Sequence, residues 1–151
     1  MHPSGGFSGA AWSPKGDRIA VLEGGLQPRA VIWDARSQLK ESAVRLDAPA
    51  AGALTALDWH PSGTFLAAGG ANNVLVVWSL GSAPAIVYTR PCSDKVNCLA
   101  FNGDGSRLAV GCDDGSLYMF DVSQDVKPAS PKPSTKEETP EPEMDEDSDT
   151  K

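Results

Sequence analysis

The chain has 151 residues, 40% of them hydrophobic, and a formal net charge of −7 at pH 7. This length is sufficient for one domain with a modest core. The sequence lacks the basic stripe typical of non-specific nucleic-acid binding and any apolar run long enough to span a membrane. The first residues, MHPSGGFSG, do not resemble a signal peptide, and the three cysteines lack C-x-x-C spacing. Reduced thiols and a cytoplasmic or nuclear location are therefore expected.

Two short β-rich runs around a tight turn occur three times along the chain. Each repeat unit contains the same three landmarks in the same order. The first is an aromatic residue (Trp12, Trp59 and Phe101), the second a turn glycine (Gly16, Gly63 and Gly105), and the third another aromatic residue (Trp33, Trp78 and Phe120). The first two sets are spaced by 47 and 42 residues and the third by 45 and 42. This period is typical of a four-stranded unit. The predicted units are 7–47, 48–91 and 92–125.

The strands of these units follow from apolar runs separated by glycine, proline and asparagine turns. In chain order they are predicted at 9–13, 18–22, 30–34, 42–46, 56–60, 65–69, 74–79, 85–89, 98–102, 107–111 and 116–122. The segment after Val122 contains a proline and makes a poor fourth strand, since proline cannot donate to a ladder. No segment shows sustained helical periodicity. The sequence predicts an all-β body over residues 1–125, in antiparallel meanders.

Residues 126–151 differ from the body in composition. They contain five prolines, no aromatic residue, and eight acidic against four basic side chains. Such a segment cannot bury enough apolar surface to offset its chain entropy, so a disordered acidic tail is expected. Candidate phosphorylation sites in it are Ser130 and Thr139, which precede prolines, and Ser134 and Thr135, which lie three residues before glutamates.

The ends of the predicted third strands carry a recognisable pattern. The dipeptides are Trp33-Asp34, Trp78-Ser79 and Phe120-Asp121. Together with the repeated turn glycines, they make the chain resemble the WD-repeat β-propellers. The resemblance covers about four-fifths of the chain. It implies a partial propeller of three four-stranded antiparallel blades, the third without its outer strand, followed by the tail.

The repeats depart from the family's pattern in their polar residues. Ala68 and Val110 stand where the family has serine or threonine, and the usual aspartate is present only as Asp114, with Asn72 in the second unit. The buried hydrogen-bond network of regular repeats is therefore expected to be incomplete. The blades should depend instead on packing of the aromatic residues that end the third strands.

Three blades do not close a propeller, because closed rings have four to eight. One interpretation is that the chain is the C-terminal portion of a longer propeller protein. The other is that two copies assemble into a six-bladed ring, which would make the protein a homo-oligomer. The sequence leaves both open.

No residue pattern predicts catalysis, a cofactor or a metal site. His60 lies in a turn and is expected to be solvated, since no nucleophile or carboxylate has a recognisable spacing to it. Asp113 and Asp114 precede a glycine, as a tight hairpin requires, and do not suggest a metal pair. Cys92 is expected in a loop, and Cys98 and Cys112 are expected on core strands.

Binding of other proteins is the favoured function, because propellers present loops on a rigid scaffold. By resemblance, the docking face carries the loops before first strands and between second and third strands. The candidate partner-binding residues on these loops are Arg29, Arg90, Ser93, Asp94, Lys95 and Asp113, with Ala71 and Asn72 beside them. The sequence therefore predicts a non-catalytic scaffold in a larger assembly. The alternative is recognition of a peptide or modified tail at the mouth of the propeller.

Overall fold

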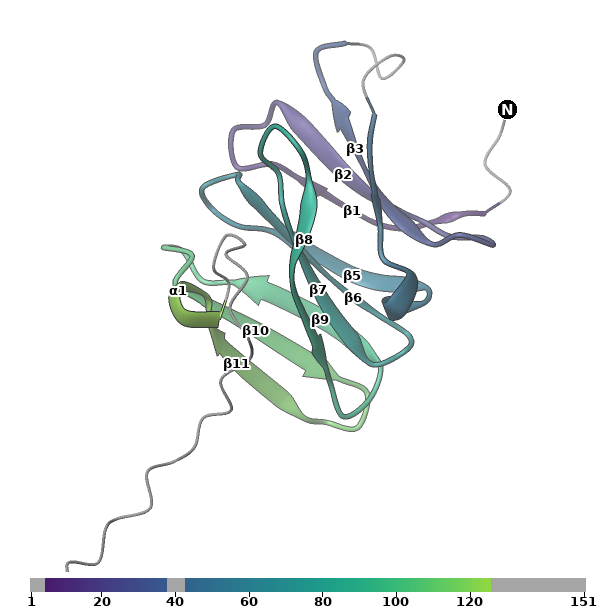
Figure 1. Ribbon diagram of the computed structural model, residues 1–151, viewed down its shortest axis with the longest axis vertical. Coiled ribbons are helices and arrows are strands. Elements are labelled where there is room, and N and C mark those ends of the chain that lie inside the picture. Colours follow the sequence, from purple (N-terminus) through teal and green to yellow (C-terminus); the bar gives the residue numbers. More distant parts are fainter. Residues whose placement is uncertain (1–4, 38–42, 126–151) are drawn as a thin grey trace, which may run out of the picture.

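The computed structural model describes residues 5–37 and 43–125 and is built of three antiparallel sheets that follow one another along the chain (Figure 1). The first sheet contains β1 (Phe7–Trp12), β2 (Arg18–Glu23), β3 (Arg29–Asp34) and β4 (Val44–Asp47). The second contains β5 (Leu54–Trp59), β6 (Phe65–Gly70), β7 (Val74–Ser79) and β8 (Ala85–Pro91), and the third β9 (Val96–Phe101), β10 (Arg107–Cys112) and β11 (Leu117–Asp121). In each sheet the strands pair in chain order. The predicted all-β partial propeller is confirmed, and we call the sheets blades 1, 2 and 3.

Blade 3 has three strands in the part of the chain that the structure describes, as predicted. After β11 the chain forms a single helical turn, α1 (Val122–Asp125), and another short turn of helix, η1 (Pro49–Ala51), precedes β5. Neither helix among the described residues is long and apolar enough to cross a membrane. The predicted tail, 126–151, lies outside the described residues, and so do its candidate phosphorylation sites Ser130, Ser134, Thr135 and Thr139.

The turn between the first and second strands of each blade is closed by the predicted glycine. Gly16, Gly63 and Gly105 have φ angles of 68°, 73° and 76°. In all three turns the glycine N–H donates to the carbonyl of the residue three positions earlier. Residues with a Cβ rarely adopt this conformation, so the repeated glycine has a backbone reason.

The core consists of two apolar layers, one on each side of blade 2. Residues of β2 and β3 pack against Trp59, Leu66 and Trp78 to form the first layer. The second layer joins the other face of β6 and β7 to Val110 and Phe120 of blade 3. The innermost strands of the blades also lie together, β1 against β5 and β5 against β9. Blade 2 is therefore covered on both faces, and blades 1 and 3 on one face each.

The aromatic landmarks are buried only where a preceding blade covers them. Trp59, Trp78 and Phe120 expose 4%, 2% and 4% of their surface. Trp12 exposes 59%, and Trp33 is half-buried. The expectation that Trp33 packs like Trp78 is therefore wrong. In the strand register Trp12 pairs with Ile19, which pairs with Trp33, so both tryptophans lie on the face of blade 1 that no other blade covers.

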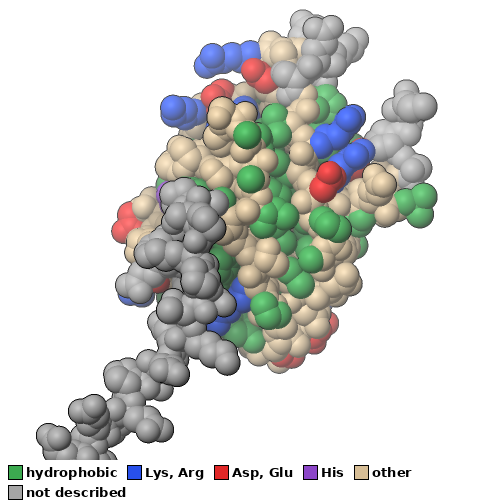
Figure 2. Space-filling model, in the orientation of Figure 1, with side chains coloured by type: hydrophobic (Ala, Val, Ile, Leu, Met, Phe, Trp, Pro, Cys, Tyr) green, Lys and Arg blue, Asp and Glu red, His purple; other side chains and the backbone are tan. Residues whose placement is uncertain are grey.

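Apolar side chains remain exposed on several surfaces of the described residues. The large ones are Phe7, Trp12, Leu26, Val44, Ile86, Leu117 and Met119. On the side of the molecule seen in Figure 2, hydrophobic side chains gather along the middle, and most charged side chains lie toward the edge. Leu117 and Met119 belong to β11 and face away from blade 2, since the alternate residues Tyr118 and Phe120 pack toward it.

Candidate functional site

The strand connections divide the molecule into two ends. One end, the loop end, carries the β2–β3, β6–β7, β8–β9 and β10–β11 connections, and the opposite end carries the glycine turns. The candidate partner-binding residues all lie at or near the loop end. They lie at two separate places on this end, because Arg29 belongs to blade 1 and the others to blades 2 and 3.

Four of the candidates form a contiguous group at the loop end of blade 3. Asp113 donates its backbone N–H to the carbonyl of Lys95 at 2.9 Å and accepts a 2.8 Å hydrogen bond from the side chain of Asn97. The carboxylate of Asp94 accepts the backbone N–H of Lys95 at 2.7 Å. The remaining member is Ser93. We call Ser93, Asp94, Lys95, Asn97, Asp113 and Asp114 the loop cluster.

Hydrogen bonds from the backbone and from side chains stabilise the ionised form of the Asp114 carboxylate. It accepts the N–H of Ser116 at 2.9 Å. A hydrogen bond from the side chain of Ser93, followed by that from the Ser116 backbone, lowers the pKa of Asp114 below its usual value. The loop cluster thus carries three carboxylates against one ammonium group and presents a negative, hydrogen-bonded surface.

Arg29 and Arg90 have partners elsewhere, although both were predicted in the docking surface. Arg29 is the first residue of β3, and its Nε lies 2.6 Å from a carboxylate oxygen of Glu23. Arg90 lies on β8, and its guanidinium stacks 4.7 Å from the ring centre of Phe120. Both side chains support blade surfaces, and the structure places neither of them in the loop cluster.

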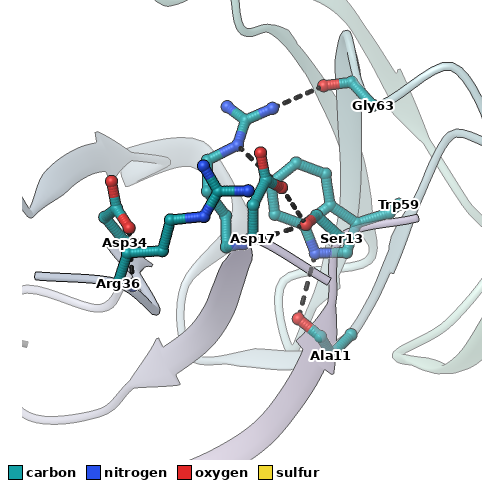
Figure 3. A network of polar contacts seen from close by, with 8 residues as sticks. Ala11, Ser13, Asp17, Asp34, Arg36, Trp59 and Gly63 are labelled. Carbon is teal, nitrogen blue, oxygen red and sulfur yellow. Dashed lines mark hydrogen bonds and ion pairs between the residues drawn. The ribbon is translucent and has the colours of Figure 1, made fainter. Parts of the chain in front are cut away.

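The sequence did not indicate a polar network at the turn end, between blades 1 and 2 (Figure 3). The hydroxyl of Ser13 donates to Asp17 at 2.8 Å and accepts the backbone N–H of Arg18 at 3.0 Å. That hydrogen bond from Ser13 is the main reason why the pKa of Asp17 is lowered. Arg18 crosses to blade 2 and donates to the carbonyl of Gly63 at 3.1 Å.

Further side chains connect blade 2 to blade 3. Thr55 donates to the carbonyl of Val96, and the carboxylate of Asp58 accepts the backbone N–H of Phe101 at 2.8 Å. Each bond joins the innermost strand of one blade to that of the next. These polar bonds therefore connect the two blades in addition to their apolar packing.

His60 belongs to the same set of contacts between blades and is not the solvated turn residue that was expected. Its Nε2 lies 3.0 Å from the carbonyl of Gly105, and its Nδ1 lies 2.6 Å from the hydroxyl of Ser62. Because a carbonyl only accepts, Nε2 carries the hydrogen and Nδ1 accepts from Ser62. The ring also meets Phe65 and Phe101 edge-on, at centroid distances of 5.6 and 5.2 Å. The arrangement anchors one turn to the next.

The three cysteines are free, and they differ in exposure. Cys112 is buried as expected, whereas Cys98 is exposed, because its side chain lies on the outer face of blade 3. Cys92 is half-buried. Burial, and then the neighbouring Cys112, raise the pKa of Cys92 to about 11.

We expect alkylation at mildly alkaline pH to modify Cys98 first in a dilute sample of the folded chain. Cys92 should react more slowly, because only the thiolate is the nucleophile and its pKa of about 11 keeps it protonated. Timed iodoacetamide labelling followed by peptide mass spectrometry measures the order. Equal rates in denaturant provide the control, and faster labelling of Cys92 in the folded chain would contradict the assignment.

Comparison with known proteins agrees with the repeats seen in the structure. The family model described as WD domain, G-beta repeat, matches residues 41–79 and 85–121. Similar proteins include the WD repeat-containing protein 26 homolog of Drosophila melanogaster, 28% identical over 118 residues, which are 74% of this chain and 18% of that protein. The Periodic tryptophan protein 2 homolog of Schizosaccharomyces pombe is 32% identical over 48% of this chain and 8% of its own length.

A third relative is Pre-mRNA-processing factor 19 of Dictyostelium discoideum, 31% identical over 51% of this chain and 15% of its own length. The chain thus spans less than a fifth of the length of each of these relatives. Among solved structures, the β-propeller domain of Myceliophteria thermophila Cps50 (Swd1) superposes with a TM-score of 0.67 at 18% identity, covering 82% of this chain and 38% of that one. Kuenenia stuttgartiensis hydrazine synthase gives 0.68 at 13% identity, over 80% and 46%. At these identities the likeness concerns the fold alone.

Proposed function

Because the chain belongs to the WD domain, G-beta repeat family, we propose that it is a non-catalytic scaffold that binds other proteins within a larger assembly. Members of this family generally serve as interaction scaffolds. The observation that carries the proposal is the loop cluster, in which backbone hydrogen bonds hold exposed charged side chains at one end of rigid strands. Fixed polar groups of this kind are typical of an interface rim.

The charge of the loop cluster suggests what the partner's surface presents. The carboxylates of Asp94, Asp113 and Asp114 surround one ammonium group, which belongs to Lys95. A partner surface rich in lysine and arginine complements this charge, which favours rapid association and makes the affinity depend on salt. Contacts of this type fit a subunit that docks through loops. Relatives named for WD repeats and for pre-mRNA processing support such a role for this chain.

The alternative, recognition of a peptide or modified tail, would be favoured by a basic or aromatic cage at the mouth of the propeller. Among the described residues, Tyr118 is an aromatic residue that contacts the loop cluster. Its hydroxyl accepts the backbone N–H of Ser93 at 3.2 Å, and its ring stacks on Phe120 at a centroid distance of 6.1 Å. Tyr118 is thus engaged within blade 3, and the scaffold role is favoured. The exposed free thiol of Cys98 fits a reducing location, and we propose the cytoplasm or nucleus.

Asp113→Asn tests this proposal, because it removes one charge and retains an oxygen that accepts from Asn97. A partner is first purified with the unmodified chain, identified by mass spectrometry and reconstituted. We expect the substitution to weaken its binding severalfold in calorimetry and to reduce the salt dependence of the affinity. The matched control is Asp104→Asn, at an exposed aspartate in the β9–β10 turn at the opposite end of blade 3.

For the control we expect an affinity equal to that of the unmodified chain. Equal affinities for all three proteins would exclude the loop cluster as the docking surface. Failure to recover any stoichiometric partner that rebinds after purification would overturn the scaffold role itself.

A further inference from the structure

The uncovered face of blade 3 contains an apolar recess of about 280 Å³. Its lining residues come from all three strands of the blade and from the β9–β10 turn, and they are Ala100, Phe101, Asn102, Arg107, Ala109 and Met119. Met119 exposes 60% of its surface. No described residue of the chain covers the recess, because blade 2 packs on the other face of these strands.

The equivalent position between blades 1 and 2 is filled by a tryptophan. Trp59 packs in one cluster with Ala20 and Ile32 of blade 1, and its indole N–H donates to the carbonyl of Ala11 at 3.0 Å. The guanidinium of Arg18 lies 5.2 Å from the centre of the ring. Ala11, Arg18, Ala20 and Ile32 therefore form the acceptor site of Trp59 on blade 1.

Blade 3 repeats this acceptor site at the same positions of its own strands. Ala11, Arg18 and Ala20 are matched 89 residues later by identical residues, and these are Ala100, Arg107 and Ala109. Ile32 is matched by Met119, a flexible apolar side chain that adapts to the shape of what it contacts. All four matching residues line the recess. The recess has the residues of a tryptophan acceptor site.

The matching tryptophan is on blade 1. Trp12 stands 47 residues before Trp59 in the repeat and exposes 59% of its surface on the uncovered face of blade 1. Blade 2 lies between blade 1 and blade 3 (Figure 1), so Trp12 cannot reach the recess of its own chain. One chain thus carries both parts of the contact, the tryptophan on the uncovered face of blade 1 and the acceptor site on the uncovered face of blade 3.

Side-chain sizes also match between the two uncovered faces. Between blades 1 and 2, a Cβ added to Gly9 would lie 3.2 Å from Cδ2 of Leu57, so little room exists there. The repeat places Cys98 of blade 3 at the position of Gly9, and Ala10 of blade 1 at the position of Leu57. If blade 3 packed on blade 1 of another copy, the larger Cys98 would face the smaller Ala10. The side-chain sizes of blade 3 are therefore complementary to those of blade 1 of the same sequence.

We propose that blade 3 of one copy of this chain receives Trp12 of a second copy, in a contact that repeats the one between blades 1 and 2. Arg107 then takes the role of Arg18 over the tryptophan ring, and the carbonyl of Ala100 accepts the indole N–H. Two such contacts close a head-to-tail pair with six blades, a number within the four to eight of closed propellers. This contact is separate from the loop cluster and goes beyond the proposed scaffold function.

Size-exclusion chromatography with light scattering on the full chain tests the proposal. The expected mass is twice the 15.8 kDa of one chain. Ala109→Glu places a charge in the recess, and Trp12→Arg removes the tryptophan, so each variant should elute as a single chain with an unchanged circular-dichroism spectrum. Ala83→Glu is the matched control, an exposed alanine in the β7–β8 turn, and should elute as the pair.

A mixture of the two variants distinguishes a head-to-tail pair from other dimers. Trp12→Arg chains retain an intact recess and Ala109→Glu chains retain the tryptophan, so the mixture has one intact contact. We expect a one-to-one pair in which alkylation of Cys98 is slowed on the Trp12→Arg chain.

A single chain at every concentration of the unmodified protein would overturn the proposal and leave the recess to a further blade of a longer chain. A series of oligomers larger than two chains would also overturn the proposal, and so would a dimer that neither substitution dissociates. Asp113→Asn, which tests the loop cluster, should leave the mass unchanged. The two proposals can therefore fail independently.

Discussion

Trp78→Ala is expected to destabilise the folded chain by about 3–5 kcal/mol, the usual cost of removing a large buried aromatic side chain. Trp78 exposes 2% of its surface and packs between blades 1 and 2 with Leu66 and Val76. Its loss leaves a cavity that the surrounding strands cannot close, because each is held in a ladder. Urea denaturation followed by circular dichroism measures the change in the free energy of unfolding.

Trp33→Ala is the matched control, since Trp33 holds the same position in blade 1 but no blade covers it. Its ring is half-buried, so the expected loss is below about 2 kcal/mol. Both variants are measured at concentrations at which light scattering finds single chains. Equal losses would contradict the assignment of Trp78 to the core between blades, and a loss near zero for Trp78 would exclude it from any core.

The architecture could be predicted from the sequence because the repeat is visible three times. The landmarks at Gly16, Gly63 and Gly105 determine the turns, and the apolar runs on each side determine the strands. The sequence also predicted the three strands that blade 3 has among the described residues, because the proline after Val122 makes a poor strand. These features depend on neighbours in sequence and on composition, which a single sequence contains.

Burial could not be predicted in the same way, because it depends on which blade faces which. Trp12 and Trp59 occupy the same place in their repeats, yet they expose 59% and 4% of their surface. The difference arises from position in the row of blades and is absent from the local pattern. Cys98 was placed in the core for the same reason, although it lies on an end face.

The candidate site was predicted in part. Ser93, Asp94, Lys95 and Asp113 do lie together, because the loops that contain them follow strands of adjacent blades. The separate position of Arg90 could not be predicted from the sequence, since its cation–π contact with Phe120 joins residues 30 positions apart. The bonds between blades formed by Asp58 and His60 were missed for a similar reason, as their partners are single backbone groups of another repeat. Backbone donors and acceptors are the same for almost every residue, so they leave no mark in the sequence.

The contact between His60 and Gly105 gives the second large effect, which we expect from Gly105→Ala. The glycine has a φ of 76°, and a Cβ there would lie 2.2 Å from Nε2 of His60. The substitution therefore adds a steric clash to the strain of a positive φ. It should cost roughly 1–3 kcal/mol for the clash beyond about 1–2 kcal/mol for the backbone conformation.

Gly16→Ala separates these two contributions. Gly16 closes the equivalent turn of blade 1 with a φ of 68°, and no atom lies within 4 Å of the position of its Cβ. Only the backbone cost remains at this position, about 1–2 kcal/mol. The difference between the two alanine variants in urea denaturation then measures how firmly His60 is held against blade 3.

His60→Ala completes a double-mutant cycle with Gly105→Ala. Without the imidazole the new methyl group has room, so Gly105→Ala in that background should cost no more than Gly16→Ala does in the unmodified chain. A cost that stays high would place the clash elsewhere in the turn. If the cost falls as expected, the turn of blade 3 is positioned by a side chain of blade 2, and the blades depend on one another for their local structure.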